Sequence, residues 1–447
     1  MPGSAPRIPT PSRTERGGAS VASVDQDGRG VARDGGKILF IDGALPGEKV
    51  EFRVWRRRPR YDLANVVRVL RESSARVTPP CPYYERCGGC SLQHQDPRAQ
   101  VANKQRVLEE AFARIGQVEP QILLAPIHGP ALGYRHRARL SVRHVARKGG
   151  VLVGFHERRT HFVVDMDSCA VLAQPVSELI RPLRELISSL ELAARIPQID
   201  VAVSQTHVAL SLRVLDPIAD GDREKLRAFA RQHAVDIYLQ FAGPDSLQPL
   251  DVARLRPLFY LLPEFDLRLE FQSSDFTQVN PGVNHVLVRR ALALLDPQPG
   301  QRMADLFCGI GNFTLAIARR GAQVVGVEGA TSLVERARHN AQLNGLADRA
   351  RFVAADLWMK PGALLQDIGP LDGLLLDPPR DGAQEVVSQL PNPGPERIVY
   401  VSCNPATLAR DAGMLVHDKG YRLAAAGVVN MFPHTAHVES IAQFVRT

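Results

Sequence analysis

Cys403 stands where a short apolar run meets a predicted helix. Residues 398–402 have the β-branched composition of a buried parallel strand, and Asn404 with Pro405 supplies a helix N-cap and a proline at the first helical position. In an open parallel sheet such a corner lies at the carboxyl edge, where ligands bind. The helix N-terminus is expected to lower the pKa of the thiol and favour thiolate. The position therefore suits a nucleophile, although cysteine near a strand end is more often a small buried hydrophobe.

A second group of cysteines lies near the start of the chain. Three of them follow the spacing C-x5-C-x2-C, namely Cys81, Cys87 and Cys90, and Gly88-Gly89 lets the backbone bend around a bound group. A closed site requires a fourth ligand, and Cys169 is the candidate because the two other cysteines belong to different motifs. The spacing alone leaves a four-cysteine zinc site and an iron–sulfur cluster both open.

A nucleoside site is predicted from residue 302 onward, where the chain has the pattern of a doubly wound α/β domain. Gly309 and Gly311 follow the first strand and let the backbone approach a ligand closely. Glu328 ends the second strand, where an acidic residue binds both ribose hydroxyls. An acid here suits S-adenosylmethionine, a sulfonium cation, better than a nucleotide phosphate. Asp356 follows the third strand and is expected to hold the adenine amino group, and Asp377 ends the next strand.

Two further segments carry polar side chains at the borders of predicted elements. Phe276 and Gln278 precede a predicted helix, where an amide can bond a cofactor or base while an aromatic ring stacks. Glu439 follows a loop and begins a strand-like run, a common place for catalytic groups. Taken by themselves, His437 and Glu439 are expected to be surface residues.

The elements that position these residues predict a multidomain α/β protein. Residues 1–18 show no apolar pattern of the kind that a folded segment has, so they predict a disordered tail. Residues 19–76 alternate β-branched segments with glycine turns and predict a small closed β-barrel. Residues 77–270 are assigned to a central α+β domain with the cysteine motif, and residues 271–447 to the nucleoside-binding α/β domain.

Positive charge is concentrated in two places. The formal net charge is +8, and residues 1–90 alone hold 16 Lys and Arg against 10 Asp and Glu. Around Trp55 and Tyr61 lie five arginines, a combination that seeks phosphates and stacks bases or else forms a solvated hairpin tip: Arg53, Arg56, Arg57, Arg58 and Arg60. Alternating basic residues also mark a hairpin predicted to turn at Gly149-Gly150, with one face either on RNA phosphate or simply exposed: Arg135, Arg137, Arg139, Arg143, Arg147 and Lys148.

The remaining sequence features do not point to a specific function. The helix predicted over residues 97–115 carries an apolar stripe that includes Lys104-Gln105, and we interpret it as core packing. No apolar run of about 18 residues predicts a membrane span, and no secretion signal is evident, so a cytoplasmic location is expected. Six cysteines are too few for a disulfide scaffold, which agrees with a reducing compartment. Nothing suggests a protein partner or more than a monomer.

Several motifs, in order, resemble the RNA m5U (uracil-C5) methyltransferase family. They are DLFCGIGNFT, GVE, LDPPR, VSCNPATLARD and PHTAHVE, and FTQVN resembles the family's FxQxN element. The N-terminal segment is similar to the TRAM domain, an OB-like RNA-binding barrel, and CxxxxxCGGC with a distant cysteine resembles a [4Fe-4S] motif. The resemblance covers the chain from residue 19 to its end. The barrel and the cysteine motif together point to the members that methylate 23S rRNA at uridine 1939.

The resemblance implies a fold, a reaction and its residues. It implies a Rossmann-like domain that binds S-adenosylmethionine through Gln278, Phe307, Asn312, Glu328, Asp356 and Asp377. Cys403 would add to C6 of uracil, and Glu439 would remove the C5 proton. A [4Fe-4S] cluster would bind Cys81, Cys87, Cys90 and Cys169. Methylation of another RNA, such as the tRNA T-loop uridine, and a non-catalytic RNA-binding role remain as alternatives, and a DNA cytosine-C5 enzyme fits less well.

Overall fold

The computed structural model describes residues 16–145, 150–243, 246–359 and 361–447. The tail expected over residues 1–18 therefore falls almost wholly outside the described residues, as do Arg147, Lys148 and Gly149 of the predicted hairpin. The chain divides into two compact units. One comprises residues 1–79, 91–103 and 434–436, and the other comprises residues 80–90, 104–433 and 437–447.

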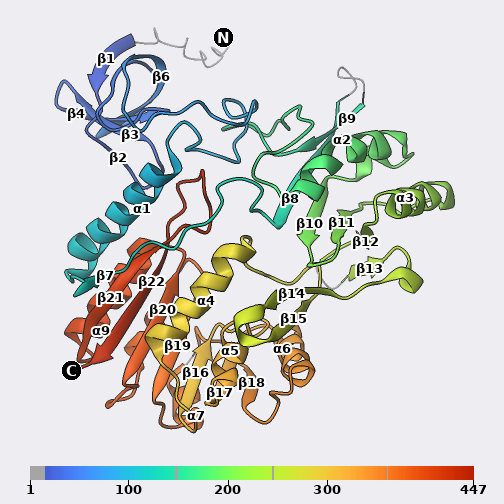
Figure 1. Ribbon diagram of the computed structural model, residues 1–447. Helices are drawn as coiled ribbons and strands as arrows, with labels where there is room; N and C mark the ends of the chain where they lie inside the picture. The colour runs from blue at the N-terminus through green and yellow to red at the C-terminus, as the bar shows by residue number, and fades with distance from the viewer. Residues whose placement is uncertain (1–15, 146–149, 244–245, 360) are drawn as a thin grey trace, which may run out of the picture. The chain divides into compact units, whose positions relative to one another are not determined.

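The first unit contains a curled six-stranded sheet (Figure 1). Its order is β1-β5-β6-β4-β3-β2, and its strands are β1 (Arg16–Ser20), β2 (Ser23–Val24), β3 (Gly30–Asp34), β4 (Lys37–Asp42), β5 (Lys49–Arg57) and β6 (Tyr61–Arg71). Gly35 and Gly36 both have positive φ and join β3 to β4 in a two-residue hairpin. The strand ladder among the described residues does not close on itself, so the expected closed barrel is a curled half-barrel.

The first sheet of the second unit, called the central sheet, is formed by strands from the middle of the sequence, between residues 137 and 249. Its order is β13-β12-β11-β10-β8-β9, with β8 (Arg137–Val145), β9 (Gly150–Gly154), β10 (Gln198–Val203), β11 (Val208–Arg213), β12 (Asp236–Gln240) and β13 (Leu247–Pro249). Helices α2 (Gln174–Ser189) and α3 (Asp220–Gln232) pack on the face that carries Ala138, Leu140 and Val142 of β8. Side chains alternate along a strand, so Arg137, Arg139 and Arg143 share the opposite face. A two-stranded ladder of β14 (Leu258–Leu262) and β15 (Leu267–Phe271) follows.

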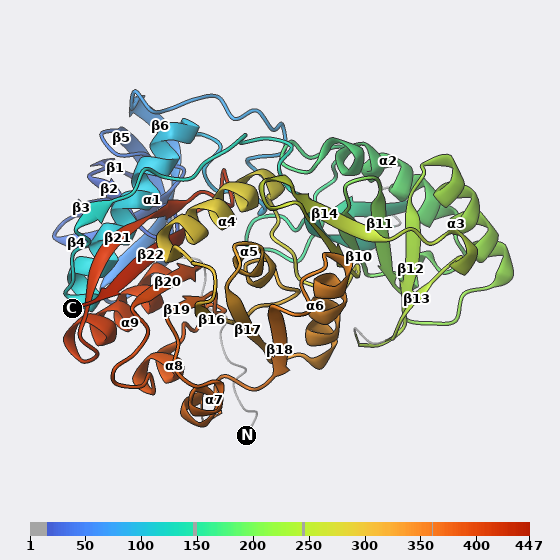
Figure 2. The same cartoon turned by 60° about the horizontal axis from the view of Figure 1, so that its bottom comes forward.

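The second sheet of this unit has eight strands in the order β18-β17-β16-β19-β20-β22-β21-β7 (Figure 2). They are β7 (Ile122–Leu123), β16 (Arg302–Leu306), β17 (Gln323–Glu328), β18 (Ala350–Ala354), β19 (Gly373–Leu376), β20 (Arg397–Ser402), β21 (Tyr421–Val429) and β22 (Glu439–Arg446). The five strands from β18 to β20 are parallel, and β22 runs antiparallel to both of its neighbours.

Helices cover both faces of this sheet, because neighbouring residues of its strands enter opposite cores. Met303 packs with α4 (Pro281–Leu295), α5 (Thr314–Arg319) and α6 (Thr331–Leu343). Ala304 packs with α7 (Pro361–Ile368), α8 (Gln384–Ser388), α9 (Pro405–His417) and the end of α1 (Pro97–Ala111). Short 3-10 turns lie at Ala193–Arg195, Val252–Arg254 and Pro263–Phe265, and a π-helical turn lies at Phe112–Gly116.

The strand order indicates at which edge of the sheet a ligand would bind. The chain goes from β16 to β17 and β18 on one side, then crosses to β19 and β20 on the other. The reversal leaves a crevice at the carboxyl ends of β16 and β19, the usual ligand site of an open α/β sheet. Among the described residues, none of the helices is both long and apolar enough for a membrane span.

Candidate active site

Cys403 lies at a strand-to-helix corner, as the sequence predicts. It follows β20 and precedes α9, whose N-cap Asn404 accepts a 3.1 Å hydrogen bond from the backbone N–H of Ala406. The backbone N–H of Asn404 in turn donates to the hydroxyl of Ser402 at 3.1 Å. Cys403 is half-buried, whereas the other five cysteines are buried. The corner therefore holds this thiol at the carboxyl edge of the sheet within reach of solvent.

Glu439 begins β22 next to this corner. Strands β20 and β22 are antiparallel, and their last pair is Ser402 with Ser440. Cys403 and Glu439 thus stand one residue beyond the same end of the ladder. Glu439 is only 8% exposed, so the expectation of a surface residue is wrong for it, whereas His437 is exposed. Burial, with the negative charge of Asp377, raises the pKa of Glu439 to about 8.

The pKa of Cys403 differs from the expectation. Burial raises it above the ordinary thiol value, the carboxylates of Glu439 and Asp377 raise it further, and Arg380 lowers it. The expected lowering is therefore wrong in the resting site, because desolvation and two acidic neighbours outweigh the helix N-terminus.

Lys104 is a site residue that the sequence pattern assigned to core packing. It lies on α1 with 2% exposure, and its Nζ donates to Oδ1 of Asn430 at 2.8 Å and to the carbonyl of Phe432 at 2.9 Å. The charges of Lys104 and Glu439 act on each other's pKa. The signal in the sequence was a lysine on the apolar side of a helix, where a charged group requires a partner.

The predicted nucleoside residues surround the crevice at β16 and β17. Glu328 ends β17, and its carboxylate accepts hydrogen bonds from the backbone N–H groups of Gly309 and Ala330, both at 3.1 Å. Phe307 follows β16 with a positive φ of 66°, a strained conformation for a non-glycine residue that is concentrated at functional sites. Its ring lies 5.9 Å from that of Trp358, a residue that no sequence motif marked.

Asn312 and Asp356 make local hydrogen bonds. The amide of Asn312 exchanges two 3.0 Å hydrogen bonds with Asn284 of α4, and its Oδ1 also accepts from the hydroxyl of Tyr260 at 2.9 Å. Asp356 is exposed after β18, and its Oδ1 accepts from the backbone N–H of Trp358 at 2.8 Å. Asn312 thus braces the glycine turn, and Asp356 orients Trp358.

Asp377 neighbours Cys403 and Glu439, whereas Gln278 lies in the loop before α4. Asp377 follows β19, and burial raises its pKa to about 7. Gln278 is half-buried in the loop between β15 and α4, and its side-chain amide makes no hydrogen bond within the described part of the chain. Phe276, two residues earlier, is 68% exposed. The loop therefore offers an uncommitted amide and an aromatic ring.

The four cysteines of the predicted cluster belong to one apolar core. Cys81, Cys87, Cys90 and Cys169 are all buried, and burial, with a smaller effect from neighbouring thiols of the set, raises the pKa values of Cys87 and Cys169. Arg158 holds the loop by donating to the carbonyls of Cys87 at 3.2 Å and Cys90 at 2.9 Å. No three His, Cys, Asp or Glu side chains within the described ranges are arranged to hold a metal ion. The four sulfurs are thus buried in one core, without the mutual placement of a metal site.

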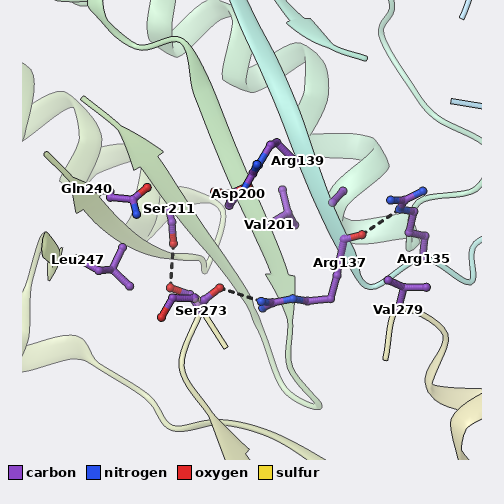
Figure 3. Close-up of a pocket in the computed structure, with 12 residues that line it drawn as sticks. Arg135, Arg137, Arg139, Asp200, Val201, Ser211, Gln240, Leu247, Ser273 and Val279 are labelled. Carbon is purple, nitrogen blue, oxygen red and sulfur yellow. Dashed lines mark hydrogen bonds and ion pairs between the residues drawn. The ribbon is translucent and has the colours of Figure 1, made fainter. Parts of the chain in front are cut away.

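A basic pocket lies on the uncovered face of the central sheet (Figure 3). It has a volume of about 330 Å³, and its polar lining includes Arg135, Arg137, Arg139, Ser211, Gln240 and Ser273. Arg139 pairs with Asp200 at 2.8 Å. Arg137 donates to the carbonyls of Ser273, at 3.0 Å, and of Asp275. Its Nη1 is buried and has no partner among the described residues.

Comparison with known proteins shows the family. The family model described as tRNA (Uracil-5-)-methyltransferase matches residues 96–446. A 23S rRNA (uracil(1939)-C(5))-methyltransferase of Nitrosospira multiformis is 54% identical, covering 95% of this chain and 97% of its own. The enzyme of the same description from Thiobacillus denitrificans is 57% identical, covering 95% of this chain and 99% of its own.

A solved structure has a similar fold over the same span. It is the Pyrococcus abyssi tRNA (uracil-54, C5)-methyltransferase in complex with S-adenosyl-L-homocysteine. The TM-score is 0.72 at 25% identity, and the match covers 96% of this chain and 99% of that one.

Proposed function

The chain belongs to the tRNA (Uracil-5-)-methyltransferase family, and we propose that it methylates C5 of uridine 1939 in 23S rRNA through a covalent Cys403 adduct. The observation that carries the proposal is the meeting of Cys403 and Glu439 at one end of the β20–β22 ladder. A nucleophile for C6 and a base for C5 are needed on the same pyrimidine, and two residues at one ladder end satisfy that need.

Cys403 acts first. Uracil C5 is a poor nucleophile, so addition of the thiolate to C6 generates an enolate whose C5 attacks the methyl carbon. S-adenosylmethionine supplies that methyl group and leaves as the thioether. Arg380 provides the positive charge that favours the thiolate, while Asp377 and Glu439 oppose it. Burial is the main reason that the pKa of Cys403 is raised in the substrate-free protein.

Glu439 completes the reaction. After methylation, C5 still carries its proton, and the carboxylate of Glu439 removes it. The C6–S bond then breaks, C5=C6 forms again and Cys403 is released as thiolate. A carboxyl group whose pKa is raised to about 8 is a far stronger base than an ordinary glutamate, which suits removal of a carbon-bound proton.

The cofactor and the target base occupy neighbouring parts of the crevice. Glu328 would hold the ribose, Phe307 and Trp358 would offer aromatic faces to the adenine, and Asp356 would accept from its amino group beyond β18. Asn312 keeps the glycine turn in place through Asn284. Asp377, whose pKa burial raises to about 7, and the free amide of Gln278 hydrogen-bond the pyrimidine edge.

The RNA lies on two basic surfaces. In the first unit, a TRAM-like domain over residues 19–76 exposes arginines around Trp55 at the end of β5. In the second unit, the pocket of Arg135 and Arg137 receives a backbone phosphate (Figure 3). Arg137 suits this role because its guanidinium is buried yet makes hydrogen bonds only to carbonyls within the described residues, which leaves its charge uncompensated by a hydrogen-bonded acid.

The cysteine motif holds a [4Fe-4S] cluster. Four buried thiols in one core provide the ligand set, and Arg158 stabilises the loop that presents two of them. With four cysteine ligands the cluster has no open iron, so its role is structural within the central domain, residues 77–270. The proposed location of the protein is the cytoplasm, where 23S rRNA is modified.

Methyl transfer to purified RNA tests the proposal. Labelled S-adenosylmethionine is incubated with unmodified 23S rRNA and with unmodified tRNA, and the labelled nucleotide is mapped. We expect label at uridine 1939 of 23S rRNA and none in tRNA. Label in the T-loop uridine of tRNA alone would favour the second candidate, which the fold of the Pyrococcus abyssi enzyme makes worth testing.

A further inference from the structure

Lys104 is a buried ammonium group held by neutral partners. Its hydrogen bonds go to Oδ1 of Asn430 and to the carbonyl of Phe432. Both acceptors belong to the segment that leaves β21 and leads to Glu439 at the start of β22. Lys104 therefore ties α1 to the loop that ends at Glu439. An ammonium group has three N–H donors, and the described residues accept from two of them, so one donor is left for the site.

A buried cation without an acid nearby is costly, and this one lies among acids. Burial lowers the pKa of Lys104, and the charge of Glu439 opposes that effect. Facing Glu439 are Asp377 from the end of β19, Cys403 from the end of β20 and Lys104 from α1. Arg380 and His437 are the basic neighbours on the exposed side. Lys104 is thus the buried positive charge that faces two buried carboxyl groups.

We propose that Lys104 is a positioning residue for the reaction, whose ammonium group favours the ionised form of Glu439, the acceptor of the C5 proton. The inference rests on the proposed function. Without the cation, Glu439 and Asp377 are two buried acids side by side, and one keeps its proton because like charges repel. A protonated Glu439 cannot accept the C5 proton, so the methylated adduct persists. The charge of Lys104 therefore sets the pH above which the adduct resolves.

The test follows formation and decay of the protein–RNA adduct from pH 6 to pH 9.5. In Lys104→Met the long apolar chain remains and the charge is lost, and Lys104→Gln is a second neutral variant whose amide group can still donate hydrogen bonds. The matched control is Gln105→Met, because Gln105 is the next residue of α1 and its Oε1 accepts from the backbone N–H of Val428 on β21. Gln105 is neutral, so its variant disturbs the same helix–strand contact without removing charge.

We expect both neutral Lys104 variants to form adduct at the normal rate and to resolve it at least tenfold more slowly at pH 7. The difference from the unaltered protein should shrink as the pH rises above about 7, where Lys104 loses its own charge, and should be gone at pH 9.5. Lys104→Arg should restore the profile, and Gln105→Met should not move it.

A uniform loss of rate at every pH, matched by Gln105→Met, would show a purely structural lysine and overturn the inference. If Lys104→Met does not fold, the profile of Lys104→Gln decides in the same way. Failure of the proposed function has a different signature, because then the unaltered protein forms no adduct at all.

Discussion

The hydroxyl of Tyr400 donates a 2.7 Å hydrogen bond to Oδ2 of Asp411, and both side chains are fully buried. Tyr400 lies on β20 and Asp411 on α9, so the bond joins the two elements on either side of Cys403. The same Oδ2 also accepts from the backbone N–H of Ala383 at 2.8 Å. The corner that presents the thiol is therefore held from beneath by a buried carboxylate, which explains how a loop residue keeps a fixed position.

Removing the Tyr400 hydroxyl should weaken this corner. Tyr400→Phe leaves Asp411 buried with one hydrogen bond fewer, so the free energy of unfolding should fall by about 1–3 kcal/mol. Urea unfolding measures this decrease. Tyr421→Phe is a control, since that hydroxyl donates to the backbone carbonyl of Pro395, before the end of β20 opposite to Cys403. Adduct formation should slow in Tyr400→Phe and not in Tyr421→Phe; equal rates would show that the bond does not position Cys403.

The reactivity of the Cys403 thiol should follow its charged neighbours. Alkylation by iodoacetamide requires thiolate. In the free protein its rate should therefore keep rising with pH beyond the ordinary pKa of a thiol. Glu439→Gln removes a negative neighbour and should shift the profile to lower pH, whereas Arg380→Gln should shift it to higher pH. Mass spectrometry of the Cys403 peptide gives the rates. Shifts in the opposite directions would contradict the electrostatic account.

The basic pocket should bind one RNA phosphate. Arg135→Gln and Arg137→Gln should each weaken binding of the rRNA fragment. The slope of log K against log salt should become shallower by roughly 0.7 when one arginine no longer pairs with a phosphate. Arg143→Gln is the matched control, because Arg143 lies on the same face of β8 but not in the pocket. Equal slopes for the Arg137 and Arg143 variants would show that the pocket does not bind a phosphate.

Substitution of one cysteine ligand should remove the cluster. Cys169→Ser should lower the iron and sulfide content of anaerobically purified protein to near zero and reduce its thermal stability, because binding energy of such a group is folding energy. Cys308→Ala is the control, since Cys308 packs in a different core beside Gly326 and should leave the iron content unchanged. Unaltered iron in Cys169→Ser would exclude Cys169 as a ligand.

Local patterns predicted the elements well where the residues themselves determine the conformation. Asn404-Pro405 predicted the start of α9, and Glu328 was placed correctly at the end of β17. Strand Gly30–Asp34 carries no such local signal, because its sequence, GVARD, lacks a continuous β-branched run and lies between two glycine turns. It forms because it pairs with β2 and β4, which is tertiary information.

The errors at the site have a common origin in burial. A helix N-terminus is visible in the sequence and suggests a lowered thiol pKa, but Glu439 and Asp377, which raise it, arrive from other strands. Lys104 lies 335 residues before Glu439 in the chain, and no local pattern links them. Trp358 likewise meets Phe307 only because β16 and the segment after β18 end at the same edge. Motifs identify the residues of the site, but the charge states of their side chains depend on which distant residues are buried beside them.

Trapping of a covalent adduct by Glu439→Gln tests the central claim most directly. The variant is incubated with S-adenosylmethionine and the rRNA fragment, and the product is measured by intact mass and by mapping of the modified peptide. Glutamine cannot accept the C5 proton, so turnover should slow by about 10²–10⁴-fold. A methylated RNA adduct on Cys403 should accumulate, and it should be absent when Cys403→Ala is added, although RNA still binds. Normal turnover without adduct, or an adduct on another residue, would contradict the assignment of Cys403 and Glu439.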